Sequence, residues 1–323
     1  MIAAPGASAV VFAYSSIGAR CLRVLVAHGI DVRLVLTHED DPAENAWFER
    51  VADVATDLGL PWIAPADPHD AQVVARIASL APDFVFSFYY RLMLKPDLLG
   101  LAARGALNLH GSLLPKYRGR APVNWAVLKG ARQTGATLHY MADKPDAGDI
   151  VDQQAVPILP DDTAADVAAK VTVAAEITLD RVIDALVAGT APRRRNPIED
   201  GSYFGGRTSE DGRIDWLQHA STIHNLVRAV APPYPGAVTT VGGREARVLR
   251  TRVLERSSPP AVPPTIGVAA QSRGSPDVAT GECLIARCGG GGTLRIDALE
   301  IDGEQYAPAA FRAAFGGSAL PLG

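Results

Sequence analysis

The sequence is poor in cysteine and has no long apolar run. Its three cysteines, Cys21, Cys283 and Cys288, include no CxxC pair, which argues against a disulfide framework and against a structural zinc site. No apolar run reaches about 18 residues, and the N-terminus lacks the charged region of a signal peptide. We therefore expect a soluble cytoplasmic protein that holds no metal and does not insert into a membrane.

Glycine is scarce at the first turn between a strand and a helix. The turn reads AYSSIGARC and contains a single glycine, Gly18. A dinucleotide fingerprint needs three glycines to approach the phosphates and to pack the following helix. The turn thus argues against NAD, FAD or a P-loop nucleotide as cofactor.

The sequence also lacks an excess of basic charge. The formal net charge is -4, so composition predicts no nucleic-acid partner. From Gly205 onward the sequence has 12 Arg, no Lys and 11 acidic residues, so basic charge barely exceeds acidic charge. A tRNA-binding surface would be expected to carry a clear excess of basic residues.

The first half alternates short apolar runs with amphipathic segments, a pattern typical of an α/β fold. Such a pattern predicts a parallel sheet with helices on both faces and a ligand site beyond the carboxyl ends of the strands. Further on, Ala136–Met141 and Ile150–Ile158 read as strands, and a long helix begins near Asp161 and ends near Val187. The first four strands are expected at Val10–Tyr14, Val32–Thr37, Trp62–Ala64 and Phe84–Phe88, and the helices between them at Ile17–Ala27, Ala43–Leu58 and Ala71–Leu80.

After about residue 205 the pattern changes to short strands separated by loop compositions such as SSPPAVPP and GGGG. Several short strands with turn signals predict a small barrel. The expected domains are therefore residues 1–204, residues 205–310 and a flexible tail at 311–323. The barrel strands are expected at Ala237–Val241, Ala246–Val253, Thr265–Val268, Cys283–Ala286 and Thr293–Leu299.

Three residues suggest acyl-transfer chemistry. Asn108 and His110 lie two apart at the end of an apolar strand, so both side chains point to the same face. Asp146 follows in the loop KPDAGD and could reach the same point. An amide can donate to a developing oxyanion, and an imidazole can stabilise that charge when protonated or relay a proton. A nearby carboxylate would raise the pKa of the imidazole and orient its ring.

The segments NLHGSLLPKYRG and DAGD resemble, in order, the signature of the folate-dependent formyltransferases. The resemblance implies a Rossmann-like formyltransferase domain followed by an OB-like C-terminal domain. It implies N10-formyltetrahydrofolate as donor and an amine as acceptor, with Asn108 and His110 holding the oxyanion and Asp146 tuning His110. The folate contacts that it implies are Leu92, Met93, Leu94, Arg120, Ala142, Asp143, Lys144, Pro145 and Asp146.

Within the family, VVFAY, THEDDPAENAWF, FSFYYR, GRAPVNW and FGGRTSEDGRIDW are similar to a branch linked to polymyxin resistance. That likeness implies a UDP-amino sugar as acceptor, namely UDP-4-amino-4-deoxy-L-arabinose, and a role in lipid A modification. Arg207 and Tyr234 are the expected contacts to the sugar nucleotide, with Tyr234 standing where the likeness predicts Trp. In that branch a decarboxylase domain follows, so the decarboxylase is expected either as a separate partner or on a longer chain from which this sequence is a piece.

Three alternatives remain open at this stage: methionyl-tRNA formyltransferase, hydrolysis of the formylfolate by water, and a folate-binding scaffold without activity. Two further motifs receive a structural interpretation. His139, in TLHYM, is interpreted as a structural residue, and the run from His38 to Asp41 as a solvated loop in preference to a metal site.

Overall fold

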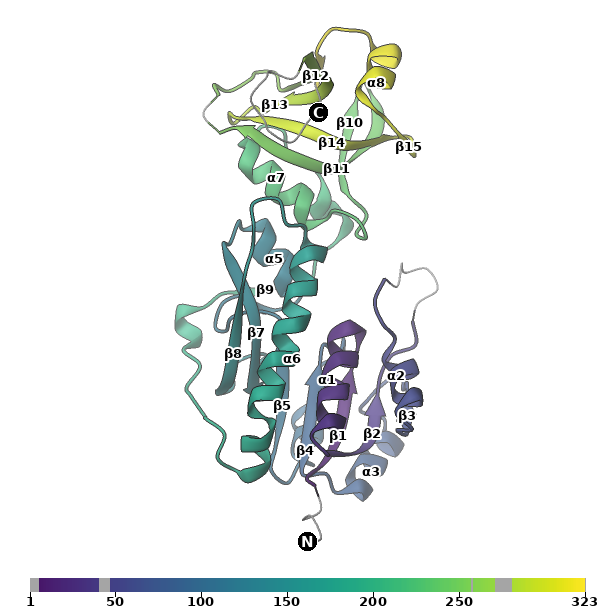
Figure 1. The fold of residues 1–323 in the computed structure, drawn as a ribbon, viewed down its shortest axis with the longest axis vertical. Helices are drawn as coiled ribbons and strands as arrows, with labels where there is room; N and C mark the ends of the chain where they lie inside the picture. Colours follow the sequence, from purple (N-terminus) through teal and green to yellow (C-terminus); the bar gives the residue numbers. More distant parts are fainter. Residues whose placement is uncertain (1–5, 41–46, 257, 271–280, 323) are drawn as a thin grey trace. The chain divides into compact units, whose positions relative to one another are not determined.

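The structure is a computed structural model that describes residues 6–40, 47–256, 258–270 and 281–322 (Figure 1). The chain divides into two compact units. One comprises Met1–Val123, Gln133–Pro157 and Ala168–Gly206, and the other comprises Asn124–Arg132, Ile158–Val167 and Arg207–Gly323. Helices α5 (Pro122–Leu128) and α6 (Ala164–Ala188) each continue across this division. Residues 124–132 and 158–167 thus belong to the second unit, although they precede residue 205, where the sequence pattern changes.

The first unit is built on a seven-stranded sheet in the order β3-β2-β1-β4-β5-β7-β8. The strands β3, β2, β1, β4 and β5 pair in parallel, whereas β7 is antiparallel to β5 and to β8. The predicted parallel sheet is thus confirmed for the first five strands, and an antiparallel pair, β7 and β8, extends it at one edge. The strands are β1 (Ser8–Ala13), β2 (Asp31–Leu36), β3 (Trp62–Ile63), β4 (Phe84–Phe88), β5 (Gly105–His110), β7 (Gln133–Tyr140) and β8 (Ile150–Pro157).

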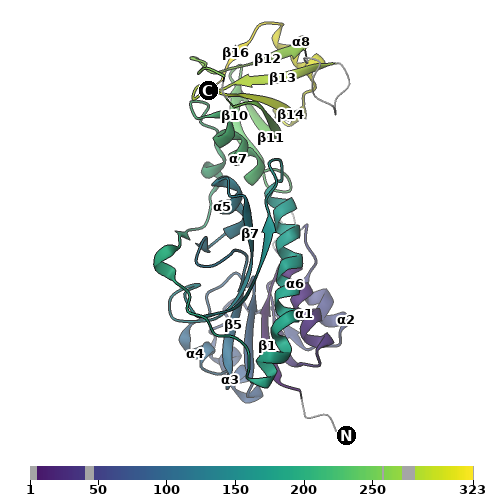
Figure 2. The same ribbon diagram turned by 60° about the vertical axis from the view of Figure 1, so that its left-hand side comes forward.

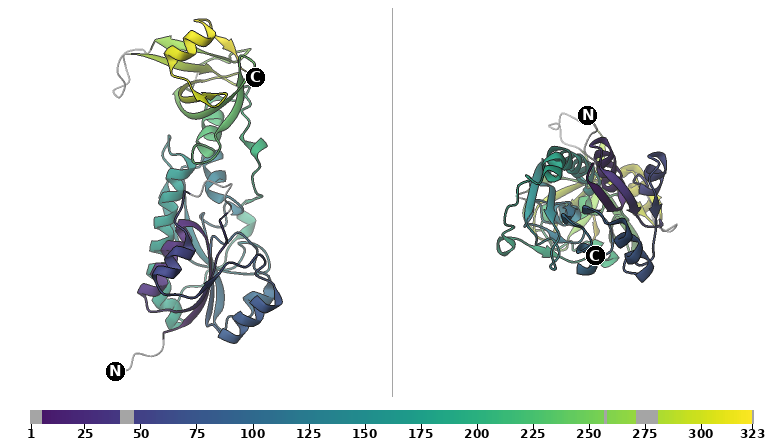
Figure 3. Two further views of the ribbon diagram at one scale, coloured as in Figure 1. Left: turned by 90° about the vertical axis from the view of Figure 1, so that its right-hand side faces the viewer. Right: turned by 90° about the horizontal axis from the view of Figure 1, so that it is seen from below.

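Helices cover both faces of this sheet, as Figure 3 shows in the view along its side. On one face α1 (Ser15–Ala27) lies beside α6 (Figures 1 and 2), and Arg20 of α1 forms an ion pair with Glu176 of α6 at 2.7 Å. On the other face, Ile77 of α3 (Ala71–Leu80) and Leu98 of α4 (Pro96–Leu99) pack into a core with strand residues such as Phe12. Every residue of β1 and β4 is buried, as expected for strands covered on both sides.

Helix α2 (Val51–Asp57) is shorter than the predicted helix Ala43–Leu58. The predicted helix has Trp47 on its apolar face together with Val51 and Val54. In the structure Trp47 is not helical and is 44 % exposed, so it does not extend that face. Residues 43–46 of the predicted helix lie outside the described residues. Among the described residues, no helix is both long enough and apolar enough to cross a membrane.

The second unit contains an antiparallel sheet in the order β10-β11-β14-β13-β12-β16, with β15 (Glu304–Gln305) paired to β14. A bridge between Val241 and Leu322 joins the first strand of this order to the residue after the last one, so the sheet nearly closes into the predicted barrel. The core lies between the sheet, α7 (Ala220–Ala229) and α8 (Pro308–Phe315). The strands are β10 (Ala237–Val241), β11 (Arg244–Glu255), β12 (Thr265–Ala270), β13 (Glu282–Arg287), β14 (Thr293–Ile301) and β16 (Leu320–Pro321).

The prediction of a flexible tail from residue 311 is wrong. Phe311 is fully buried in the core of the second unit, and Leu320 of β16 pairs with Ile266 of β12. The glycine- and alanine-rich composition of this segment hides its contribution, since a few apolar side chains provide the contacts, namely Phe311, Phe315, Leu320 and Leu322.

Candidate active site

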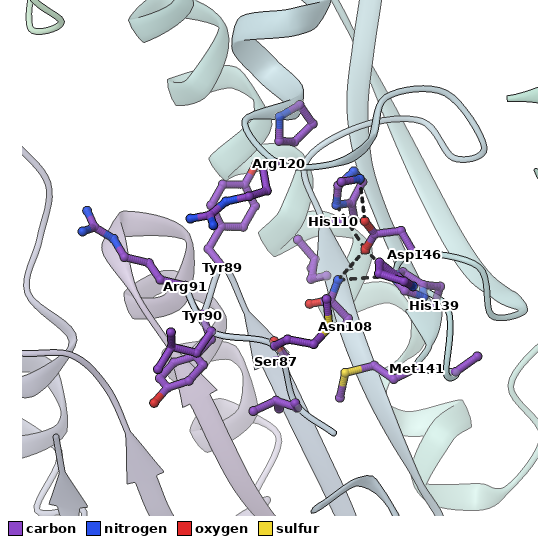
Figure 4. A pocket seen from close by; sticks show the side chains of 18 of the residues that line it. Ser87, Tyr89, Tyr90, Arg91, Asn108, His110, Arg120, His139, Met141 and Asp146 are labelled. Carbon is purple, nitrogen blue, oxygen red and sulfur yellow. Dashed lines mark hydrogen bonds and ion pairs between the residues drawn. The ribbon is translucent and has the colours of Figure 1, made fainter. Parts of the chain in front are cut away.

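A pocket of about 570 Å³ opens in the first unit beyond the carboxyl ends of β4 and β5 (Figure 4). Its wall includes Ser87 of β4, residues 89–94 and Leu99 after β4, and residues of the loop between β7 and β8. This is the edge at which an α/β sheet binds its ligands, because the loops diverge there and the strand ends leave polar groups free. All residues that line the pocket belong to the first unit.

Asn108 and His110 both face this pocket from β5, as their spacing in a strand predicts. His110 is only 6 % exposed. Its Nε2 lies 2.8 Å from the carbonyl oxygen of Tyr117, so that nitrogen carries the hydrogen and donates it. The remaining ring nitrogen, Nδ1, then presents a lone pair toward Asp146.

Asp146 is brought to the same point by the loop between β7 and β8. Its backbone is left-handed, with φ of 51°, and its carbonyl oxygen accepts a hydrogen bond from Asn196 Nδ2 at 3.0 Å. The carboxylate Oδ2 accepts the N–H of Gly119 at 2.8 Å. Oδ1 lies 3.4 Å from Asn108 Nδ2 and 3.5 Å from His110 Nδ1. The three residues that the sequence singles out are therefore in contact (Figure 4).

Burial decides the charge of His110. Removal from water favours the neutral ring, and it lowers the pKa of His110 despite the opposing attraction of Asp146. Asp146 does act on this pKa in the expected direction, upward, but burial outweighs it. The net effect of the surroundings is to favour the neutral imidazole.

Asp146 stays ionised. Burial, the largest single influence, opposes its charge, but the attraction of His110 and His139 when they are protonated and the hydrogen bond from the N–H of Gly119 together outweigh it. They hold the pKa of Asp146 well below its usual range. The site thus places an imidazole, a carboxylate and an amide in contact, with His110 buried and Asn108 and Asp146 partly buried.

His139, for which the sequence pattern favours a structural role, is part of this cluster. It is 1 % exposed, and its Nε2 lies 3.1 Å from Asn108 Nδ2 and 3.5 Å from Asp146 Oδ1. Its Nδ1 donates to the carbonyl oxygen of Tyr140 at 2.8 Å, so Nε2 accepts a hydrogen bond from Asn108. This contact fixes which way the Asn108 amide points. It arises because Asn108 and His139 are direct partners across β5 and β7, a register that only the fold reveals.

Comparison with known proteins agrees with this geometry. Residues 9–183 match the model of the formyl transferase family, and residues 207–312 match that of the formyl transferase C-terminal domain. The chain belongs to the formyl transferase family. It is therefore a formyltransferase.

Solved structures share the fold of this formyltransferase. The sugar 3N-formyl transferase WlaRD, solved in the presence of dTDP and 5-N-formyl-THF, is 16% identical over 92% of this chain and 98% of its own, with a TM-score of 0.68. The N-formyltransferase from Helicobacter canadensis, in complex with folinic acid and dTDP-3-aminofucose, is 17% identical over 93% of this chain and 100% of its own, with a TM-score of 0.64. HypX from Aquifex aeolicus, in complex with tetrahydrofolic acid, is 18% identical over 95% of this chain and 46% of its own, with a TM-score of 0.58.

Most of the folate contacts expected from the sequence line the pocket of the formyltransferase. Met93, 60 % exposed, offers an apolar surface at its rim, and Arg120 a guanidinium group. Asp143 and Lys144 are exposed and do not line the pocket. The expected residues that do line it are Leu92, Met93, Leu94, Arg120, Ala142, Pro145 and Asp146.

The two expected sugar contacts lie in the second unit of the formyltransferase. The guanidinium carbon of Arg207 lies 5.4 Å from the centre of the Trp125 ring. Burial raises the pKa of Tyr234, opposed by a hydrogen bond with Asn124. Neither residue lines the pocket around His110.

The other motifs have structural explanations. His38 stacks on Tyr90 with ring centres 4.1 Å apart, and burial lowers its pKa to about 4. Asp41, the last residue of that run, lies outside the described residues. Across the described part of the chain, no group of three or more His, Cys, Asp or Glu side chains could hold a metal ion.

Proposed function

We propose that this formyltransferase moves the formyl group of N10-formyltetrahydrofolate to the 4-amino group of a UDP-amino sugar, with UDP-4-amino-4-deoxy-L-arabinose as the acceptor. The observation that carries the proposal is the cluster of Asn108, His110 and Asp146 at the base of the pocket. One solved relative is named a sugar 3N-formyl transferase and was solved with dTDP and 5-N-formyl-THF. Another N-formyltransferase was solved with folinic acid and dTDP-3-aminofucose, which supports a sugar nucleotide as acceptor.

The geometry supports one order of proton transfers. The amine nitrogen forms a bond to the formyl carbon, and the neutral His110 takes the proton released by that nitrogen at Nδ1. The resulting imidazolium lies 3.5 Å from the carboxylate of Asp146, which stabilises it. His110 then returns the proton to N10 as the bond between the formyl carbon and N10 breaks. The products are the N-formyl sugar and tetrahydrofolate.

Asn108 stabilises the oxygen on which negative charge develops. Its Nδ2 has two hydrogens, and one of them is held by His139. The second contacts Asp146 only at 3.4 Å, a long distance that leaves it available to the formyl oxygen. Removing one such donor typically costs about 10² to 10³ in rate.

The pocket suits an anionic donor. Arg91 and Arg120 line it, whereas Asp146 is the single carboxylate among its described lining residues. Two guanidinium groups can bind carboxylates such as those of the folate tail. On the sugar side we assign Arg207 and Tyr234 of the second unit, and a lipid A modification pathway linked to polymyxin resistance as the context.

The test is formyl transfer measured separately with three acceptors: UDP-4-amino-4-deoxy-L-arabinose, dTDP-3-aminofucose and methionyl-tRNA. We expect turnover with the UDP sugar and loss of turnover in the variants Asn108→Ala and His110→Ala, with the fold intact. Transfer to methionyl-tRNA alone would identify the other branch of the family. Release of formate without any amine, or tight folate binding with no turnover, would indicate a hydrolase or a binding scaffold.

A further inference from the structure

A second cavity of about 270 Å³ lies in the second unit and is formed by residues of that unit alone. It shares no residue with the pocket around His110. Three arginines line it, Arg252, Arg256 and Arg295, against one acidic side chain, Asp161. A cavity this small lies below the range of about 300–1,000 Å³ typical of sites for drug-sized ligands.

Two of these arginines face each other directly. Arg252 of β11 and Arg295 of β14 are partners in the antiparallel ladder. Like charges opposite each other destabilise a sheet unless an anion lies between them. Asp297 supplies one carboxylate for both, with Oδ1 at 2.5 Å from Nε of Arg295 and Oδ2 at 3.4 Å from Nε of Arg252. One carboxylate thus serves two guanidinium groups.

Two of the three guanidinium groups are incompletely paired within the part of the chain that the structure describes. Nε of Arg252 is buried without a hydrogen bond, since its contact with Asp297 is an ion pair only. Arg256 is exposed and has no ion pair with a described residue. Asp161, the acid of the cavity, lies 3.6 Å from Nε2 of His224. The guanidinium groups therefore exceed the carboxylates around the cavity.

His224 reports the same positive potential. Its Nδ1 contacts Thr251 at 2.9 Å and its Nε2 contacts the carbonyl oxygen of Pro160 at 2.9 Å, so the ring is held in place. Burial lowers the pKa of His224, the hydrogen bond to Pro160 and the charge of Asp161 oppose that shift, and the charges of Arg228 and Arg256 add to it. The wall of the cavity is thus rigid, polar and positive.

We propose that this cavity binds the phosphate group of a small molecule, with Arg252, Arg256 and Arg295 as its donors. Guanidinium groups match the geometry of phosphate oxygens and make charge-assisted hydrogen bonds to them. A bound phosphate would also offset the repulsion between Arg252 and Arg295. The site is independent of formyl transfer, because none of its residues lines the catalytic pocket.

The test is calorimetric titration of the full chain with inorganic phosphate, inorganic diphosphate and UMP. Arg256→Gln changes an exposed residue of the cavity, whereas Arg287→Gln changes an exposed arginine of β13 outside it. Arg120→Gln removes a cation from the catalytic pocket. We expect Arg256→Gln to weaken diphosphate binding roughly tenfold to a hundredfold, and the other two variants to leave it unchanged.

The three probes identify the ligand class. Tighter binding of UMP than of inorganic phosphate would assign a phosphate monoester, and the reverse order would assign the free anion. Three results would overturn the proposal: no binding at millimolar diphosphate, equal weakening by Arg256→Gln and Arg287→Gln, or loss of binding in Arg120→Gln alone. Formyl transfer by Arg256→Gln should equal that of the wild type, which separates this site from the proposed function.

Discussion

The substitution Asp146→Asn tests the electrostatic reasoning most directly. It keeps the shape of the side chain, and the backbone carbonyl of residue 146 can still accept the hydrogen bond from Asn196. It removes the negative charge that stabilises His110 in its protonated form. Its amide would also donate to the lone pair of His110 Nδ1, the atom that takes the proton.

The expected loss of rate follows from the distance between the two side chains. Asp146 Oδ1 and His110 Nδ1 are 3.5 Å apart, which at an effective dielectric constant of about 20 corresponds to an attraction of about 5 kcal/mol between unit charges. Both side chains are nearly buried, so solvent screens this pair little. Since each 1.36 kcal/mol is tenfold in rate, we expect kcat to fall by about 10³ or more. The KM for the formyl donor should change little.

The assay is single-turnover formyl transfer across a range of pH. Because burial lowers the pKa of His110, the wild-type rate should fall only below the ordinary histidine pKa of about 6.5, and that fall should move to lower pH in Asp146→Asn. Asp149→Asn is the matched control, since Asp149 belongs to the same loop but pairs with Arg193 at 2.9 Å. A rate within threefold of the wild type in Asp146→Asn, with folate still bound, would refute the reasoning.

Three further predictions concern other parts of the chain. His139→Leu should lower kcat about tenfold with little change in KM, because Asn108 loses the partner that orients its amide; steady-state kinetics check this. Phe311→Ala should lower the free energy of unfolding of the second unit by about 3–5 kcal/mol, measured by denaturant titration. A negligible loss would support the prediction that residues 311–323 are a flexible tail. His28→Gln should destabilise the protein at about pH 6 by up to roughly 1 kcal/mol and be neutral at high pH. Hydrogen bonds that His28 donates to Asp180 and Asp184 raise the pKa of His28, so its stabilisation is present below the unfolded pKa and lost as pH rises through the folded one.

The local features of the fold were readable from the sequence because they depend on short-range patterns. Buried strands such as Phe84–Phe88 are continuous apolar runs, and α3 begins after Asp70, whose side chain accepts from the N–H of Gln72. The antiparallel pairing of β7 with β5 and β8 could not be predicted from the sequence. The direction in which β7 enters the sheet depends on the path of the chain after β5, which local patterns do not specify. The packing of residues 124–132 and 158–167 with the second unit likewise depends on long-range contacts.

By itself, the sequence determined which side chains could perform the chemistry. Asn108 and His110 must share a face because a strand alternates, and the glycine-poor first turn excludes a dinucleotide cradle. Only the tertiary structure decided how these groups behave. Burial, which no sequence position reveals, favours the neutral form of His110, and the register between β5 and β7 places His139 beside Asn108. The charge of a group and the neighbours of an amide both depend on what the fold places around them.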